Sequence, residues 1–292
     1  SVPEDQLLSS RTSFSVAAKA ALLVDLNTGR TVYEQDADER IYPASLTKIM
    51  TCLVALEHST LTDKVTVRRE HLREGSSMYL RAGERVTGRE LLYGLMLRSG
   101  NDAAVALAIL CDGSVERFAA RMNARAAKLG MENTHFQNPN GLDEEGHFST
   151  ARDLARLARA AMKNPDFREA AGTKNASFGQ RALTNHNKLL WSYPGANGVK
   201  TGYTRAAGRI LVSSAERGGR HLIAVTICDP DDWNDHTHLL DWAFENYEYR
   251  CVAGDTPVYA VPVLSATVEL CAAVPERPAY LLVHPDDQVA LK

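Results

Sequence analysis

Apolar and β-forming residues come in short runs near both ends of the main part of the chain. Residues 21–26 and 31–33 are two such runs, and the turn between them contains Gly29. This pattern predicts a β-hairpin, because a glycine-containing turn lets two neighbouring strands pair. Further strands are predicted over residues 198–203, 209–213 and 221–225.

Between these runs the apolar spacing changes to that of helices. After Pro43, the side chains Ile49, Leu53 and Leu56 recur at i, i+4 and i+7 and predict one buried helical stripe. Thr87 stands three residues before a glutamate, as in a capping box that begins a helix. Further helices are predicted over about 102–110, 115–129, 150–162 and 236–247. Strands, helices and strands again predict an α+β fold, a sheet with a helical insertion over about 68–170.

The pattern of apolar residues changes after residue 250. Short apolar runs over 257–263, 267–270 and 280–283 lie among prolines and predict strands, with no helical pattern. We therefore divide the chain into a main domain, 1–250, and a small all-β C-terminal domain, 251–292. About forty residues bury too little apolar surface for a stable core of their own. This domain therefore either packs on the main body or has lost its continuation.

Composition excludes some classes of protein. The 292 residues are 45% hydrophobic and carry a formal net charge of −3, which argues against a general nucleic-acid or membrane-surface binder. No run approaches the ~20 apolar residues of a membrane span. The N-terminus lacks a secretory signal, so the chain is either cytoplasmic or the mature form of an exported protein.

The cysteines are five, scattered, and without a CxxC pair, so neither a disulfide framework nor a zinc site is expected. We interpret them as small buried hydrophobic residues. They are Cys52, Cys111, Cys228, Cys251 and Cys271. The lone histidines are expected to have surface or hydrogen-bonding roles; they are His58, His71, His147 and His186.

Candidate chemistry begins at Ser45 and Lys48. Serine is a poor nucleophile at neutral pH and needs a nearby base. Residues three apart share a helix face, and burial or a second cation lowers the pKa of a lysine until it can accept a proton. Taken alone, this spacing occurs often by chance and also fits an N-capped surface helix.

Two further triplets contain polar groups suited to a peptide substrate. In Ser99-Gly100-Asn101 the glycine allows a tight turn that can present both polar side chains to one cleft. In Lys200-Thr201-Gly202 a cation and a hydroxyl suit a terminal carboxylate, and the glycine permits close backbone approach. Taken alone, the first triplet fits a helix C-cap followed by an Asn N-cap better than a functional site, and the second also fits an ordinary strand with an exposed lysine.

Together and in this order, the three motifs resemble those of the serine penicillin-recognising enzymes, SxxK, SxN and KTG. The flanking residues over 43–51, 99–106 and 198–204, with 138–142 and 187–191, resemble the low-molecular-mass D-alanyl-D-alanine carboxypeptidases. The resemblance covers roughly residues 14–249. It implies a β-lactamase/transpeptidase-like fold and a serine hydrolase that removes the terminal D-alanine from peptidoglycan stem peptides.

The resemblance also implies roles for individual residues. Ser45 would attack the D-Ala-D-Ala carbonyl and form an acyl-enzyme, with Lys48 as its base. Ser99 and Asn101 would relay a proton and hold the substrate amide. Lys200 and Thr201 would bind the terminal carboxylate, while the N–H groups of Ser45 and Tyr203 would form the oxyanion hole beside Gly202. It implies no cofactor, and β-lactams as covalent inhibitors.

Two features depart from the usual family pattern. Tyr203 stands where a histidine often follows KTG, so proton relay there is in doubt. Four aspartates stand within 229–236, where many relatives have a basic, glycine-containing segment, and this version is similar to a sporulation-associated Gram-positive subset. Relatives are extracytoplasmic bacterial enzymes that commonly continue into a C-terminal membrane helix, so anchoring through a segment absent from this chain is also implied.

Alternatives remain open. A class A β-lactamase needs a glutamate with an asparagine four residues later, and no glutamate here has one, which favours a peptidase. A D,D-endopeptidase would use the same residues, as would a noncatalytic sensor that had lost the chemistry. A metal site is a weaker reading than a solvated acidic loop that caps the final helix. Its ligands would be Asp231, Asp232, Asp235, His236 and His238.

Overall fold

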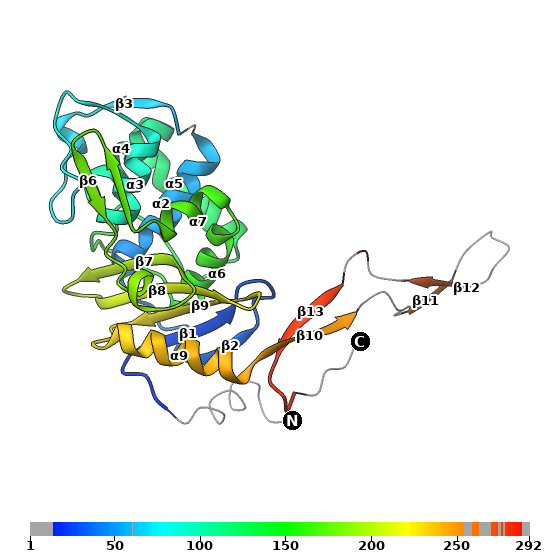
Figure 1. Ribbon diagram of the computed structural model, residues 1–292. Helices are drawn as coiled ribbons and strands as arrows, with labels where there is room; N and C mark the ends of the chain where they lie inside the picture. The colour runs from blue at the N-terminus through cyan, green and yellow to red at the C-terminus, as the bar shows by residue number, and fades with distance from the viewer. Residues whose placement is uncertain are drawn as a thin grey trace.

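A five-stranded antiparallel sheet forms the centre of the molecule (Figure 1). The computed structural model describes residues 14–59, 61–253, 259–262, 270–273, 276 and 278–287. The strand order is β2-β1-β9-β8-β7. The strands are β1 (Ala20–Asp25), β2 (Thr31–Gln35), β7 (Ala196–Thr204), β8 (Gly208–Arg217) and β9 (Arg220–Ile227). The predicted hairpin and three later strands are confirmed.

Both faces of this sheet are covered, and the strands alternate accordingly. Leu22 and Val24 of β1 belong to the larger hydrophobic cluster beneath the helical insertion, whereas Ala21 and Leu23 belong to a second cluster. Successive strand side chains point to opposite faces, so one strand serves two cores. The second core lies against α9 (Asp232–Asn246), which Figure 1 shows along the face opposite the insertion.

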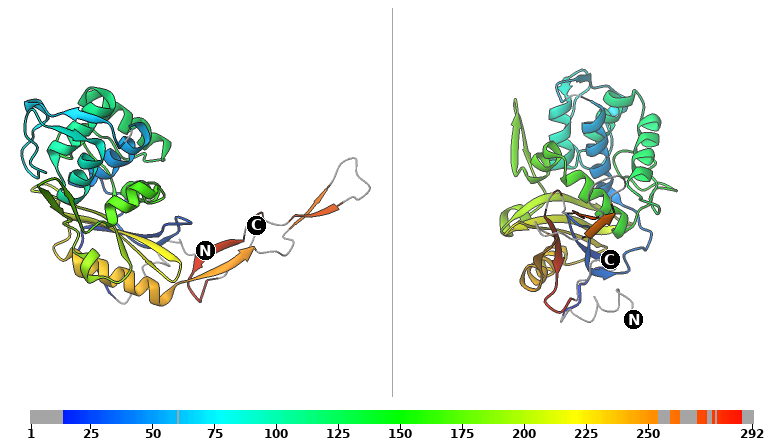
Figure 2. Two further views of the ribbon diagram at one scale, coloured as in Figure 1. Left: turned by 45° about the horizontal axis from the view of Figure 1, so that its top comes forward. Right: turned by 90° about the vertical axis from the view of Figure 1, so that its right-hand side faces the viewer.

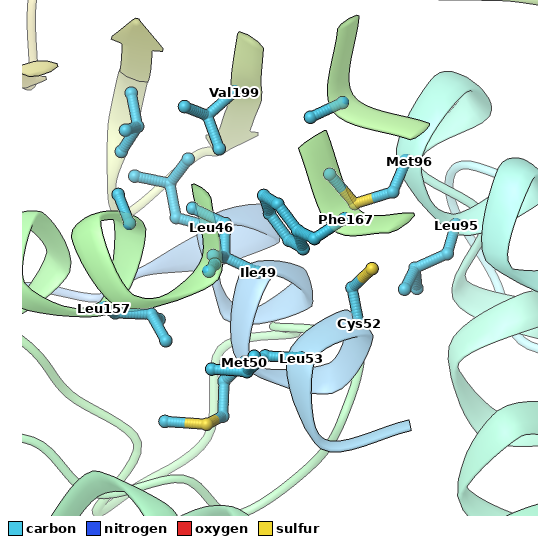
Figure 3. Packing of buried hydrophobic residues seen from close by; sticks show 14 of the residues in the cluster. Leu46, Ile49, Met50, Cys52, Leu53, Leu95, Met96, Leu157, Phe167 and Val199 are labelled. Carbon is cyan, nitrogen blue, oxygen red and sulfur yellow. The ribbon is translucent and has the colours of Figure 1, made fainter. Parts of the chain in front are cut away.

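The insertion is mainly helical, as predicted. Its helices are α3 (Gly88–Arg98), α4 (Asn101–Asp112), α5 (Val115–Lys128), α6 (Ala151–Met162) and α7 (Pro165–Gly172). Around α2 (Thr47–His58), Figure 3 shows Ile49 beside Phe167 of α7, with Leu157 of α6 and Val199 of β7 nearby. Because α2 is buried along most of its length, its first turn is held rigidly where the helices meet the sheet.

Local chemistry explains where the helices begin. The hydroxyl of Thr87 accepts the backbone N–H of Glu90, and the Glu90 carboxylate accepts the N–H of Thr87, so the predicted capping box is confirmed. Shorter elements were not predicted. They are β3 (Lys64–Thr66), β4 (Arg85–Thr87), β5 (Asn175–Phe178), β6 (Arg181–Thr184), α7, α8 (Leu189–Ser192) and the 3₁₀ turns η1 (Ala44–Leu46) and η2 (Arg69–His71).

Beyond α9 the chain continues as two antiparallel strand pairs. The pair β10 (Glu248–Ala253) and β13 (Ala279–Val283) lies against the main body, and the pair β11 (Tyr259–Pro262) and β12 (Leu270–Ala273) extends away from it (Figure 2). The hydroxyl of Tyr249 donates to Asp25 Oδ1 at 2.6 Å, and Arg30 donates to the carbonyl of Leu282 at 2.6 Å. The first pair therefore leans on the sheet. Most of the strand predicted over 267–270 lies outside the described residues.

The interpretation of the cysteines needs correction. Cys52 is buried in α2 and Cys111 is half-buried at the end of α4, but Cys228 and Cys251 are exposed. Cys228 follows the last residue of β9, where the chain turns away from the sheet, and Cys251 lies in the peripheral strand β10. The side chain of Cys271 lies outside the described residues. Within the part of the chain that the structure describes, no helix is long and apolar enough to cross a membrane.

Candidate active site

Ser45 lies in the short 3₁₀ turn η1, directly before α2. The sequence pattern predicted one continuous helix here, whereas the structure has a 3₁₀ turn that passes into an α-helix. The i, i+3 relation survives this change, and Lys48 Nζ donates to Ser45 Oγ at 2.9 Å. Ser45 is half-buried and lines a cleft, so its hydroxyl is accessible to a ligand.

Lys48 is completely buried and surrounded by neutral acceptors. Besides Ser45 Oγ, its amine donates to Asn101 Oδ1 at 2.8 Å and to the carbonyl of Asn140 at 2.5 Å. Burial, and then the charge of Lys200, holds the pKa of Lys48 well below its ordinary value, while Asp102 acts weakly in the opposite direction. The lowered pKa favours the neutral amine, which can accept a proton from Ser45.

Ser99 and Asn101 lie on the tight connection between α3 and α4. Ser99 is the C-cap of α3 in the left-handed region at φ 57°, and Gly100 is the N-cap of α4. The turn directs both side chains toward the two lysines: Ser99 Oγ accepts from Lys200 at 3.0 Å and Asn101 Oδ1 from Lys48. The amide of Asn101 also donates to the carbonyl of Glu74 at 2.7 Å, which fixes its orientation.

Strand β7 forms the opposite wall. Lys200 is 2% exposed, and its amine donates to Ser99 Oγ and to the carbonyl of Thr201. Burial lowers the pKa of Lys200 to about 7. A Cβ at Gly202 would lie 2.8 Å from Ile210 Cγ1 and 3.3 Å from the backbone nitrogen of Ser45, so only glycine lets β7 approach Ser45 this closely. Tyr203 follows with its side chain 67% exposed.

These walls enclose a cleft of about 500 Å³. Ser45, Ser99, Thr201, Gly202 and Tyr203 line it, and Lys48, Asn101 and Lys200 lie buried directly behind this surface. The structure thus brings all eight predicted site residues together. Further lining residues were not predicted; they are Ser76, His186, Arg209, Ile210, Asp232 and Trp233.

A backbone turn that the sequence patterns did not assign completes the surroundings of Lys48. In the segment 138–142, Gly141 has φ +86°, and a Cβ there would lie 1.8 Å from the carbonyl oxygen of Ala44. The N–H of Gly141 donates to Asn138 Oδ1 at 2.8 Å, which closes the turn that presents the Asn140 carbonyl. The Asn-Pro-Asn-Gly composition is typical of a turn, but nothing in it identifies Lys48 as the partner.

Two buried groups support the nucleophile from behind. His147 accepts the N–H of Gln137 at Nδ1, so its Nε2 carries the proton and donates to Thr47 Oγ1 at 2.8 Å. Burial lowers the pKa of His147 to about 4, so the ring is neutral. Asp102 accepts bonds from Ser77, Met78, Leu80 and Ala103, and thereby fixes the loop that leads from Ser76 along the cleft.

The acidic segment 229–236 is engaged with protein partners. Asp232 pairs with Arg209 at 2.5 Å, and the buried His236 bonds Ser213 and Thr226. Asp235 accepts the N–H of Ala17, and Asp231 accepts from Asn234. Among the described residues no three His, Cys, Asp or Glu side chains are placed to hold a metal ion. Asp232 and Arg209 instead form part of the cleft wall.

Comparisons with known proteins agree with this geometry. A family model, D-alanyl-D-alanine carboxypeptidase, matches residues 7–231. The carboxypeptidase DacF of Bacillus subtilis is 41% identical over 246 residues, covering 79% of this chain and 63% of the relative. DacC of Escherichia coli is 41% identical over 251 residues, covering 80% of this chain and 63% of the relative.

Solved structures extend the likeness to the fold. Penicillin binding protein 5 from Haemophilus influenzae superposes with a TM-score of 0.87 at 29% identity, covering 95% of this chain and 85% of that one. A mutant of the Streptomyces K15 DD-transpeptidase gives 0.76 at 36% identity, covering 80% of this chain and 100% of that one. The expected transpeptidase-type α+β fold is confirmed. The chain spans slightly less than two thirds of the length of the first curated relatives. By its sequence and its fold, the chain belongs to the D-alanyl-D-alanine carboxypeptidase family, peptidase S11, among the low-molecular-mass penicillin-binding proteins.

Proposed function

We propose that the protein is a serine D,D-carboxypeptidase that removes the terminal D-alanine from peptidoglycan stem peptides through an acyl-enzyme on Ser45. The observation that carries this proposal is the contact of 2.9 Å between Ser45 Oγ and the fully buried amine of Lys48. A lysine kept neutral by burial and by a second cation is a base for a serine nucleophile.

In the first step neutral Lys48 takes the proton of Ser45 as its oxygen attacks the D-Ala carbonyl. The developing oxyanion accepts from the N–H groups of Ser45 and Tyr203, a pairing supported by the close approach of Gly202 to the Ser45 nitrogen. Ser99 Oγ already accepts from Lys200, so its own hydrogen is available to the departing amine. As the C–N bond breaks, D-alanine leaves with that proton, and Ser99 takes a proton from the Lys200 ammonium group that donates to it, so Ser99 remains a neutral hydroxyl.

The remaining site residues hold the substrate. Thr201 Oγ and the Lys200 amine bind the terminal carboxylate, and Asn101 holds the substrate amide near Ser45. Water then hydrolyses the ester and restores Ser45. The exposed side chain of Tyr203 supports a binding role rather than proton transfer at that position. A β-lactam would acylate Ser45 in the same way.

The substrate places the protein outside the cytoplasmic membrane of a bacterium. Attachment to that membrane through a further C-terminal segment, which the family resemblance implies, is part of the same proposal.

Incubation with a D-Ala-D-Ala pentapeptide and with fluorescent penicillin tests the assignment. The protein should release D-alanine and become labelled, and Ser45→Ala should do neither while unfolding at the same temperature. D-alanine release by Ser45→Ala would refute the nucleophile. Rapid multiple-turnover hydrolysis of nitrocefin would instead indicate a β-lactamase.

A further inference from the structure

One cation lines the catalytic cleft without a role in the chemistry described above. Arg209, the second residue of β8, is the only lysine or arginine among the described residues that line this cleft. Its side chain is 45% exposed. Lys48 and Lys200 lie behind the cleft surface, and their amines are bonded to protein acceptors. Arg209 is therefore the cation that a ligand in the cleft can contact most directly.

The guanidinium of Arg209 is held in one orientation. Its Nε and Nη2 donate to the two carboxylate oxygens of Asp232, at 3.2 Å and 2.5 Å, and its Cζ lies 5.8 Å from the centroid of the Trp233 ring. Asp232 is itself almost fully buried, at the first residue of α9. Within the described part of the chain, Nη1 of Arg209 donates to no protein group. A planar fork that is fixed on one side and open on the other is suited to a carboxylate.

The pairing of β7 with β8 places Arg209 beside Thr201, one of the residues assigned to the terminal carboxylate. Tyr203 is directly opposite Arg209, and Thr201 is opposite Leu211. Because residues two apart on a strand point to the same side, Arg209 is the diagonal neighbour of Thr201 on one face of the sheet. Such neighbours lie about 7–8 Å apart, within reach of a long side chain. A carboxylate bound at Thr201 is thus accessible to the free Nη1.

The buried amine of Lys200 is less suited to provide a lasting charge for this carboxylate. It donates to Ser99 Oγ and to the carbonyl of Thr201, and burial lowers its pKa to about 7. In the proposed reaction it also gives a proton to Ser99 as D-alanine leaves, so its charge is lost during the reaction. A guanidinium keeps its proton at any pH at which proteins are folded. Arg209 can therefore hold the carboxylate while Lys200 changes its protonation state.

We propose that Arg209, oriented by Asp232, provides the permanent charge that holds the terminal carboxylate of the substrate beside Thr201, while Lys200 mainly supplies the proton for Ser99. The inference rests on the proposed function, because it concerns the same acylation step. It extends to β-lactams, whose carboxylate would occupy the same position. Arg209 would then select for a leaving group that has a carboxylate.

Two thioester substrates with the same acyl-D-alanyl group test this assignment. One has a thioglycolate leaving group with a free carboxylate, and the other has the methyl ester of that group. In both, the C–S bond breaks, the ester to Ser45 forms and Lys48 takes the serine proton, while the thiolate leaves without a proton from Ser99. The uncharged substrate therefore still reacts, and the ratio of the two kcat/KM values measures how well the carboxylate is bound.

Arg209→Gln should lower kcat/KM by about tenfold on the charged thioester, as expected for the loss of a charge-assisted hydrogen bond, and leave the uncharged one unchanged. Arg209→Lys keeps the charge but not the fork, so it should recover part of the loss. In the wild type the ratio should change little as the pH is raised through 7, whereas in Arg209→Gln it should fall, because only Lys200 remains. The matched control is Arg205→Gln, at an exposed arginine of the same hairpin outside the cleft lining, which should change neither substrate.

The outcomes separate this inference from the proposed function. An equal loss on both thioesters in Arg209→Gln, or no loss on either, would overturn the role of Arg209. A wild-type ratio that falls as the pH is raised through 7 would assign the carboxylate to Lys200 instead. If the wild type neither cleaved the thioesters nor became labelled by fluorescent penicillin, the proposed function would fail and this inference with it.

Discussion

Lys200 should make the free energy of unfolding of the protein rise as the pH is raised above 7. Burial lowers its pKa from 10.5 to about 7, whereas in the unfolded chain it keeps the higher value. Between these values the unfolded state binds more protons than the folded state, so the free energy of unfolding rises with pH. One pKa unit corresponds to about 1.4 kcal/mol. From pH 7 to pH 9, with half of the folded-state proton already lost at pH 7, this lysine alone contributes a rise of about 2 kcal/mol.

Lys200→Met removes this contribution while retaining most of the side-chain volume. The free energy of unfolding, measured by urea denaturation with tryptophan fluorescence at pH 7, 8 and 9, should rise by about 2 kcal/mol less in the variant than in the wild type. Comparing the two proteins cancels the titrating groups that lie far from Lys200, whereas Lys48 and His186 lose the effect of its charge in the variant. The control is Lys128→Met, at an exposed lysine that ends α5, which should follow the wild type. Parallel curves for wild type and Lys200→Met would show that Lys200 is not held neutral by the fold.

Two further substitutions test how the nucleophile is supported. Gly141→Ala would place a Cβ 1.8 Å from the Ala44 carbonyl at a φ of +86°, so it should cost about 2 kcal/mol or more and slow penicillin labelling of Ser45, as measured by thermal unfolding and labelling kinetics. Asp102→Asn removes the negative charge that raises the pKa of Lys48, so the acid limb of the labelling rate should move to lower pH. A limb that moves to higher pH would contradict this electrostatic account.

Helices and strands with a periodic pattern of apolar residues could be predicted from the sequence. Short elements that lack such a pattern could not. Helix α6 has apolar positions on one side and a Thr150 cap, and it was found within one residue of its limits. Strands β3 and β4 have three residues each and are separated by residues 67–84, so no local pattern joins them. Helix α7 does have a local signal in the sequence, an Asn164 cap followed by Pro165 at the first helical position.

The residues of the site that act through a reactive side chain could be predicted from the sequence. The spacing of Ser45 and Lys48 already implied their contact, and the order of the three motifs implied the rest through the family resemblance. The backbone carbonyl of Asn140 is different, because any residue has such an oxygen and only the fold brings it within 2.5 Å of Lys48. The pairing of Arg209 with Asp232 in the cleft wall also could not be predicted, because the two residues are brought together only by the packing of α9 on β8.

What keeps the two lysines reactive is the placement of the acidic side chains. Within the described part of the chain, neither Lys48 nor Lys200 has a carboxylate partner, and every acceptor of Lys48 is neutral. Asp102 is the nearby exception, but its oxygens accept from Ser77 and from three backbone N–H groups. A carboxylate in direct contact would favour the charged amine and raise its pKa. By engaging Asp102, the loop from Ser77 to Leu80 therefore helps Lys48 to remain a base.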